Sequence, residues 1–164
     1  MSVEMSLLDA ALHFASREVA IHAAANAALE RVATKIEKTA KSEFGVYQPA
    51  VGGFDEWPEL AESTQQERER LGFTPNDPLL RTGDLRDSIG HRVGDFEAEI
   101  GSDNEIMVFQ EFGTERIPPR PVLGPAAERN HDAILAELGG AVVAGILGGD
   151  LIHPSLGYDS VVSS

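Results

Sequence analysis

The residues of this chain that could do chemistry at a metal ion are its five histidines: His13, His22, His91, His131 and His153. No two of them stand in the HExxH pattern or in another spacing typical of metal ligands. A site assembled from histidines and carboxylates of distant segments is still open. A small metal-dependent hydrolase is therefore one candidate class.

Motifs for nucleophilic and phosphate chemistry are missing from the sequence. It contains no GxSxG elbow, no P-loop and no GxGxxG fingerprint. Asp84 and Asp87 stand three residues apart beside a predicted turn, where helix capping and surface charge explain them. Ser88 has no base close in sequence and is expected to pack beside Ile89. We therefore expect no enzyme and assign no catalytic residue, metal ligand or cofactor.

The composition is that of one globular domain with a large excess of acid. The chain has 164 residues, 42% of them hydrophobic, and no apolar run long enough to span a membrane. It has no cysteine, which excludes disulfides and thiolate zinc sites. Glu4 and Asp9 stand where a secretory signal would be basic, so we expect synthesis in a cytoplasm. With 13 basic and 27 acidic residues the formal charge is −14, and a basic face that grips nucleic acid is not expected.

One long helix is predicted at the start of the chain, over residues 7–40. Apolar and small residues recur there in alternating steps of three and four, from Leu8 to Ala40. At about 1.5 Å per residue such a helix is roughly 50 Å long. A small core cannot cover that length, so part of the helix is expected to pack on a neighbouring subunit. His22 and Asn26 interrupt the stripe, either as polar residues satisfied at a helix contact or as a buried pair that sets register.

Loops and a short helix are predicted to follow. Residues 44–58 are rich in glycine, proline and aromatic side chains without a clear period, which is typical of a loop. Tyr47 and Trp57 either pin this loop to the core or anchor a subunit contact, where aromatic residues are enriched. Residues 58–70 are helix-prone with proline in the first turn, and their charges are expected to form a solvated face. Residues 72–78 return to a loop.

A small antiparallel sheet or meander is predicted next. Asp84 is expected to cap a short helical turn. Apolar residues then alternate over 89–93 and 96–100, with a tight turn at 94–95 and acidic side chains on the outside. Residues 106–112 form a third apolar segment, either a strand or a short helix.

The end of the chain is predicted to be extended, then helical, then an arm. Pro118, Pro119 and Pro121 cannot donate backbone hydrogen bonds and hold the chain extended. A helix is expected to begin at Gly124, and residues 149–164 are rich in glycine, serine and proline, as in a flexible arm.

Three short elements of the central stretch form an ordered pattern. Residues 82–89 read Thr-Gly-Asp-Leu-Arg-Asp-Ser-Ile, residues 111–114 read Glu-Phe-Gly-Thr, and residues 119–123 read Pro-Arg-Pro-Val-Leu. This order resembles a family of tailed-bacteriophage morphogenesis proteins. The family includes minor tail and tail-completion proteins of lambda-like phages and the virion morphogenesis protein of Mu-like phages. Residues 57–60, Trp-Pro-Glu-Leu, further resemble the Mu-like branch.

The resemblance covers roughly residues 57–130 and differs from the family pattern at two places. The family often has Tyr-Ala before the second element, where this chain has Met107, Val108 and Phe109. The family also usually has phenylalanine at the position of Val122.

What the resemblance implies is a structural role without turnover. Members of the family form a ring, commonly of six subunits, that closes the head-proximal end of the tail and joins it to the head connector. The implied partners are further copies of the chain, the tail tube protein on one side and a head-closure or connector protein on the other. DNA would pass through the channel without specific binding. The implied location is the head–tail junction of the virion, after assembly in the host cytoplasm and without membrane contact.

Several residues are candidates for subunit contacts. Arginine side chains are planar donors suited to the carboxylates of a neighbour, although Arg86 and Arg120 could instead brace their own loops. The stiff proline segment would lose little entropy on docking. The candidate interface residues are Arg81, Arg86, Glu111, Phe112, Pro118, Pro119, Arg120, Pro121, Tyr47 and Trp57. Glu97 and Glu99 are candidates for an acidic channel lining along which DNA slides.

The predicted fold is therefore α+β: a small antiparallel sheet packed with a long N-terminal helix and a C-terminal helix, with extended loops for oligomer contacts. We expect a single tail-completion-like domain over residues 1–148, with its motif core at 57–130 and the arm at 149–164. A head-closure or connector protein of the same neck is the first alternative. A metal-dependent hydrolase and a host-encoded oligomeric adaptor without a virion role are the others.

Overall fold

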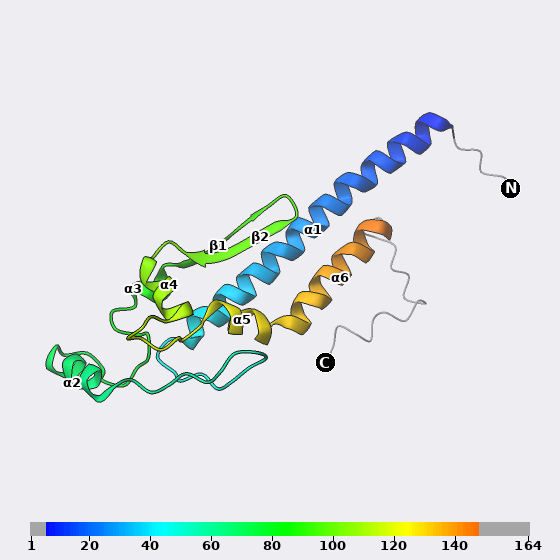
Figure 1. Cartoon of the computed structure of the whole chain (residues 1–164). Helices are drawn as coiled ribbons and strands as arrows, with labels where there is room; N and C mark the ends of the chain where they lie inside the picture. The colour runs from blue at the N-terminus through cyan, green and yellow to red at the C-terminus, as the bar shows by residue number, and fades with distance from the viewer. Residues whose placement is uncertain (1–5, 148–164) are drawn as a thin grey trace.

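One long helix, α1 (Leu7–Glu43), is the central element, and a β-hairpin and the C-terminal helices pack along it (Figure 1). The computed structural model describes residues 6–147. The long helix predicted over residues 7–40 is confirmed. Its C-terminal half buries one stripe of small and apolar side chains at helical spacing: Ala28, Val32, Ala33, Ile36 and Ala40.

A two-stranded antiparallel hairpin lies along α1. Strand β1 (Ile89–Gly94) pairs with β2 (Glu97–Ser102), with Ile89 opposite Ser102. The side chains of β1 alternate between the α1 side and solvent, which confirms the predicted alternation. Among the described residues the sheet has only these two strands, so the predicted antiparallel sheet is a hairpin and not a longer meander.

The two polar residues in the stripe of α1 hold the tip of this hairpin. The ring centroids of His22 and Phe96 are 4.1 Å apart. The side-chain oxygen of Asn26 accepts a hydrogen bond from the backbone N–H of Phe96 at 3.2 Å. Phe96 has a φ of 60°, a conformation that costs a non-glycine residue energy. Both residues therefore contact the turn of the hairpin, Asn26 through a hydrogen bond and His22 through its ring.

The segment that could have been strand or helix is helix α4 (Glu105–Phe112). Asn104 caps it, because its side chain accepts the N–H of Ile106 at 3.0 Å. Just before the hairpin, α3 (Asp84–Asp87) forms the predicted helical turn, but Asp84 does not cap it. Gly83 is the N-cap residue, in a left-handed conformation, and the carboxylate of Asp84 instead accepts the hydroxyl of Thr82 at 2.7 Å.

The predicted C-terminal helix is divided in two. Helix α5 (Leu123–Arg129) ends at Asn130, and α6 (His131–Leu147) then runs back along α1 (Figure 1). The Asn130 amide donates to Thr39 of α1 and to the carbonyl of Ala126, both at 2.8 Å, and so fixes the break. The arm predicted over residues 149–164 lies outside the described residues.

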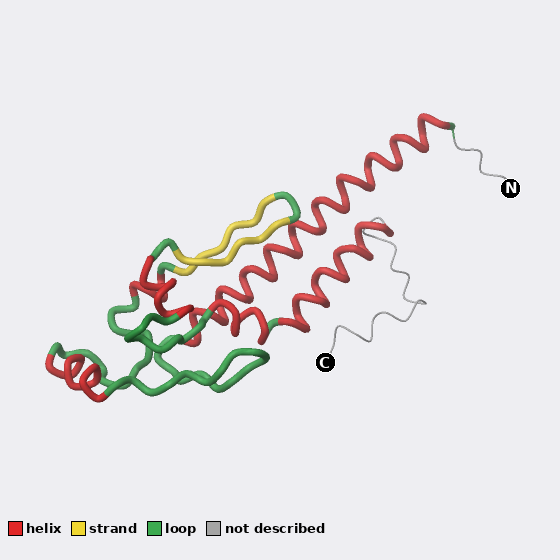
Figure 2. The backbone as a smooth tube through the Cα atoms, viewed as in Figure 1, coloured by secondary structure: helices red, strands yellow, loops and turns green. Residues whose placement is uncertain are grey.

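Helix α2 (Glu62–Arg70) lies beyond the C-terminal end of α1, and the long loop before it reaches back alongside α5 (Figure 2). The predicted start at Pro58 is wrong, since the helix begins at Glu62. The carbonyls of Pro58 and Glu59 accept hydrogen bonds from Arg120, and the N–H of Leu60 donates to the Tyr47 hydroxyl. These tertiary hydrogen bonds use the backbone groups of residues 58–60, so the helix begins only at Glu62.

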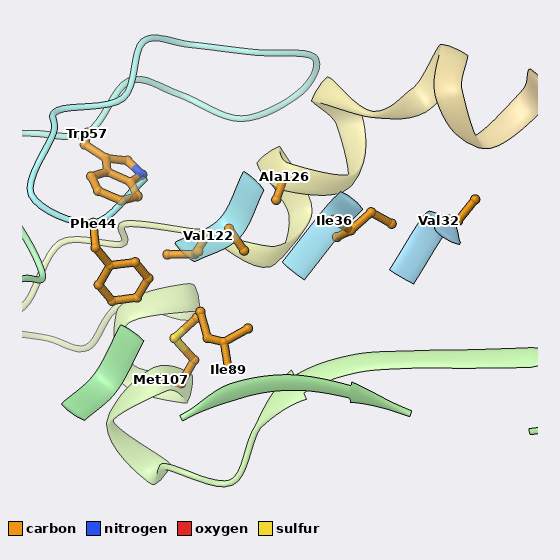
Figure 3. Packing of buried hydrophobic residues seen from close by; sticks show 9 residues of the cluster. Val32, Ile36, Phe44, Trp57, Ile89, Met107, Val122 and Ala126 are labelled. Atoms are coloured by element: carbon orange, nitrogen blue, oxygen red, sulfur yellow. The ribbon is translucent and has the colours of Figure 1, made fainter. Parts of the chain in front are cut away.

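The hydrophobic core lies where the end of α1 meets β1, α4 and α5 (Figure 3). Ile89 and Val122 are among its most completely buried side chains. It consists of Val32, Ile36, Ala40, Phe44, Trp57, Ile89, Met107, Val122 and Ala126. The α+β fold predicted from the sequence is thereby confirmed.

Candidate assembly site

Two of the three motif elements are joined to each other by hydrogen bonds. The carboxylate of Glu111, at the end of α4, accepts the backbone N–H groups of Val122 at 2.8 Å, Leu123 at 3.0 Å and Gly124 at 3.3 Å. These N–H groups open α5 and have no partner within that helix. The Arg120 N–H also donates to the Gln110 carbonyl at 2.7 Å. A charge-assisted cap therefore connects the second motif element to the third.

Gly113 and Thr114, at the end of the second motif element, shape the turn that leads to the third motif element. Gly113 has a φ of 72°, and a Cβ there would stand 2.9 Å from the carbonyl oxygen of Ile117 and from the nitrogen of Pro119. Only glycine fits that position without strain. The hydroxyl of Thr114 accepts the N–H of Ile117 at 3.1 Å, and its own N–H donates to the Ile117 carbonyl at 2.8 Å.

Arg120 is a buried brace. Its side chain is 5% exposed and donates to the carbonyls of Pro58, at 2.8 Å, and Glu59, at 3.0 Å. Trp57 is 4% exposed, and its indole N–H donates to the Pro121 carbonyl at 3.0 Å. Of the roles left open by the sequence, these two residues have the internal one, since each holds the 44–61 loop to the proline segment.

Tyr47 and Glu111 also have partners inside the chain. The Tyr47 hydroxyl donates to the side chain of Asn76 at 2.6 Å and accepts the N–H of Leu60 at 3.0 Å. It thereby connects the two ends of the 44–61 loop with the loop that contains Asn76. Glu111 uses both carboxylate oxygens in the cap of α5. Both side chains are half-buried, and their polar groups form hydrogen bonds within the chain.

The remaining interface candidates are accessible. Phe112 is 78% exposed, and Pro118 and Pro119 are exposed beside it. Arg81 is exposed and lies 4.9 Å over the ring of Phe73, a cation–π contact. Arg86 is half-buried and pairs with its neighbour Asp87 at 2.8 Å, so the bracing role suits it as well. Pro121 is half-buried.

The outer face of α4 extends this accessible surface, and only Phe112 of this face was predicted as an interface residue from the sequence. Ile106, Phe109 and Phe112 are exposed, while Met107 faces the core at 3% exposure. Their spacing of three is a helical signal. It could have been used only if the segment had been assigned to a helix rather than a strand.

A second apolar face lies on the N-terminal half of α1, which projects beyond the hairpin (Figure 1). Leu7 is 92% exposed and Val19 is 70% exposed, and Leu8 and Leu12 are exposed as well. Residues 6–147 provide no cover for these four side chains. The sequence predicted that part of this helix packs on a neighbouring subunit without indicating which part, and the N-terminal half is the part left exposed here.

The acidic pair proposed for a channel lies on the solvent side of β2. Glu97 and Glu99 are exposed, and Glu99 pairs with Arg92 across the hairpin at 2.6 Å. The predicted outward orientation of both is confirmed. Whether they face a channel depends on neighbours, so that role stays a prediction.

The ionisable clusters of the described part connect elements to α1. His91 of β1 lies between Glu37 and Glu30 of α1, and their hydrogen bonds raise the pKa of His91 above its ordinary value. Glu43 is buried against Arg129, and desolvation by burial raises the pKa of its carboxyl to about 7. No group of three or more His, Asp or Glu side chains within residues 6–147 is arranged to hold a metal ion. None of the helices described is long and apolar enough to cross a membrane.

A comparison of the chain with protein-family models, with curated proteins and with solved structures finds no match in any of the three. We therefore infer function from the contacts and exposed faces described above and from the motif resemblance.

Proposed function

We propose that this protein is a structural subunit of a bacteriophage virion that forms a ring at the head-proximal end of the tail, as a tail terminator or tail-completion protein. The observation that carries the proposal is the junction of α4 with the proline segment. There the second and third motif elements form one capped unit, and Phe112 at its edge is 78% exposed. A stiff frame that presents an apolar side chain suits a permanent subunit contact.

The two uncovered apolar faces support an assembly role. Monomeric proteins rarely expose large contiguous apolar patches, and such patches commonly mark protein–protein contacts. Here one lies on α4, at Ile106, Phe109 and Phe112, and the other on the N-terminal half of α1. A ring subunit needs two different faces, one for each neighbour.

The candidate contact residues divide into supports and contacts under this proposal. Phe112, Pro118, Pro119 and Arg81 are the contacts, because they are exposed. Trp57, Arg120, Glu111, Tyr47 and Pro121 are supports that hold the frame in place. Glu97 and Glu99 line the channel in this proposal, where acid keeps DNA from binding.

Electron microscopy of particles made without this gene tests the proposal. We expect DNA-filled heads beside separate tails, because the joint between them is missing. Heads that lose their DNA would instead favour the head-closure alternative one layer up. Intact joined particles would refute a role in the neck.

Complementation with single variants sharpens the test. Phe112→Ser is expected to reproduce the deletion phenotype, while Leu71→Ser is the matched control, since Leu71 is an exposed apolar residue at the end of α2. Equal complementation by both variants would show that Phe112 of α4 has no part in the proposed subunit contact. For the hydrolase alternative, metal analysis of the purified protein is the discriminating measurement, because a stoichiometric bound ion would contradict our proposal.

A further inference from the structure

A cleft of about 600 Å³ opens between α2, the segment 79–85, α4 and the segment 116–120. Four arginines line it: Arg68, Arg81, Arg116 and Arg120. We call it the arginine cleft. Two of these residues were outside the predicted interface, and Arg68 lies in a charge run that was expected to be a solvated face.

The arginines of this cleft differ from most other basic residues of the chain because they form no ion pairs with carboxylates of the described residues. Of the 13 lysines and arginines, six form ion pairs with carboxylates in the described structure. They are Arg31, Lys35, Lys41, Arg86, Arg92 and Arg129. The seven others have no such pair, and four of those seven line the cleft. In a chain with a formal charge of −14, unpaired positive charge is concentrated at one place.

Two of the four guanidinium groups are buried and form no ion pair with a carboxylate of the described residues, although the charge of Asp77 partly offsets that of Arg68 from a longer distance. Arg68 is 9% exposed and donates to the carbonyls of Asp77 at 2.5 Å and Leu80 at 3.3 Å, as Arg120 does to Pro58 and Glu59. Burial lowers the pKa of both arginines, and each is lowered further by another arginine, Arg68 by Arg81 and Arg120 by Arg68. Carbonyls satisfy the N–H donors but do not cancel the charge, so an anion in the cleft would be stabilised.

The rim and walls indicate what kind of anion fits. Arg81 and Arg116 are exposed at the rim, where their guanidinium groups can form paired hydrogen bonds with a carboxylate. Leu79, Leu85 and Ile106 add apolar side chains to the lining of the cleft. An acidic side chain on a polypeptide, with apolar neighbours, matches both features.

We propose that the arginine cleft binds carboxylates of a second copy of this chain, and that this contact joins neighbouring subunits. The chain itself is rich in the required group, since it has 27 acidic residues and only nine cations outside the cleft. The cleft and the acidic surface that fills it are different patches. Such a contact is head-to-tail and produces a ring when the rotation closes. The inference rests on the proposed function for its ring, and it names the chemistry of the contact.

DNA phosphate is the other anion to consider, and the observations disfavour it. The net charge of −14 repels a polyanion at long range, and Glu59 and Asp84 stand in the cleft wall. A second copy of the chain also carries −14 and is repelled at long range, but its 27 acidic residues are interspersed with 13 lysines and arginines, so its charge is less dense than that of a DNA duplex. Binding of a DNA duplex is therefore an outcome that the test must separate.

Charge reversal at the rim tests the proposal. The test variant is Arg81→Glu with Arg116→Glu, and the matched control is Lys38→Glu with Arg70→Glu, which makes the same charge change at exposed positions outside the cleft. All four sites are exposed, so both variants are expected to fold, as circular dichroism would verify. Sedimentation velocity over a range of protein and salt concentrations then measures self-association.

We expect the wild-type protein to self-associate and to dissociate as salt rises, because ion pairs at an interface are screened. The test variant is expected to associate roughly tenfold or more weakly, while the control associates like wild type. Arg81→Lys with Arg116→Lys keeps the charge and should retain most of the association. Equal association of the test variant and wild type, or a wild-type protein that is monomeric at every concentration, would overturn the proposal. So would duplex binding that the test variant alone loses while its self-association stays unchanged.

Failure of this inference and failure of the proposed function give different results. A protein that does not associate through the cleft, yet whose deletion separates heads from tails, refutes only the inference. Association through the cleft combined with intact particles in the deletion refutes only the role in the neck.

Discussion

The carboxylate of Glu111 accepts the backbone N–H of Val122 at 2.8 Å, across eleven residues of sequence. This bond joins the end of α4 to the start of α5, and the same carboxylate also accepts the N–H of Leu123 at 3.0 Å. Val122 is fully buried in the core. The glutamate therefore determines where the proline segment enters the core, and it explains why the second and third motif elements occur together.

Replacement of Glu111 is expected to destabilise the protein. Glu111→Ala leaves the first N–H groups of α5 without an acceptor, and we expect a loss of about 2 kcal/mol in the free energy of unfolding. Glu111→Gln keeps one acceptor oxygen and should lose less. Chemical denaturation of both variants and of Glu115→Ala, an exposed neighbour, measures this. A Glu111→Ala variant as stable as Glu115→Ala would contradict the assigned cap.

Trp57 and Phe112 were both predicted as interface residues, but in the structure Trp57 is buried in the core and Phe112 is exposed. Trp57→Ala removes a core side chain and should cost about 4 kcal/mol in the free energy of unfolding. Trp57→Phe keeps most of the packing and loses the bond to the Pro121 carbonyl, at a cost of about 1 kcal/mol. Phe112→Ser should change stability by less than about 0.5 kcal/mol, because the side chain is exposed. Thermal or urea unfolding of the three variants checks this order, and a reversed order would refute it.

The part of the fold that repeats with a regular period was predictable. The stripe of α1 and the alternation in the hairpin follow from residue types alone, because periods of 3.6 and 2 are properties of the two backbones. Residues 106–112 have too many apolar side chains for either period to stand out. Two features favour a helix over a strand: Asn104 caps the segment, and only Met107 of the segment is buried in the core.

The contacts that place polar groups were not predictable, because they join segments far apart in sequence. Arg68 is buried since the carbonyls of Asp77 and Leu80 surround its guanidinium, and nothing in the run of charges around it indicates this. Arg120 was assigned two possible roles, and only the position of the Pro58 carbonyl decides between them. The arginine cleft could therefore not be found from the sequence.

The hydrogen bonds between His91 of β1 and two glutamates of α1 are expected to make folding stability depend on pH. His91 lies between Glu30 and Glu37, and Lys41 pairs with Glu37 from the next turn of α1. The hydrogen bonds to Glu30 and Glu37 raise the pKa of His91 above 6.5. A group with a raised folded pKa stabilises the fold fully below its unfolded pKa and loses this effect as pH rises through the folded value.

His91→Gln is therefore expected to be less stable than wild type by about 1 kcal/mol at pH 6 and nearly equal to it at pH 9. Urea unfolding of both proteins across this range measures the difference. His131→Gln is the control, since His131 is exposed and its nearest carboxylate is that of the adjacent Asp132. A difference between wild type and His91→Gln that does not change with pH would show that the charge of His91 has no part in holding the hairpin.

The buried carboxyl of Glu43 is also expected to reduce folding stability as pH rises, but over a lower pH range than His91. It is 2% exposed and pairs with Arg129, but one of its oxygens has no hydrogen-bond partner. Desolvation raises its pKa from 4.5 to about 7 despite the opposing charge of Arg129. The unfolded chain thus releases this proton at a lower pH than the folded protein does. Folding stability from this group is complete below pH 4.5 and is lost as pH rises through about 7.

Glu43→Gln removes the titration and retains an amide that can accept from Arg129. Wild type is expected to lose about 3 kcal/mol more than this variant between pH 4.5 and pH 8, since a pKa difference converts into free energy at about 1.4 kcal/mol per unit. Combining Glu43→Gln with His91→Gln separates the two groups, because the contribution of His91 to stability changes with pH only above about pH 6.5, whereas that of Glu43 changes mostly below pH 7. Urea unfolding at pH 5, 6, 7 and 8 gives the profile of each protein. Parallel profiles for wild type and Glu43→Gln would mean that Glu43 is ionised throughout this range and that its pairing with Arg129 outweighs its burial.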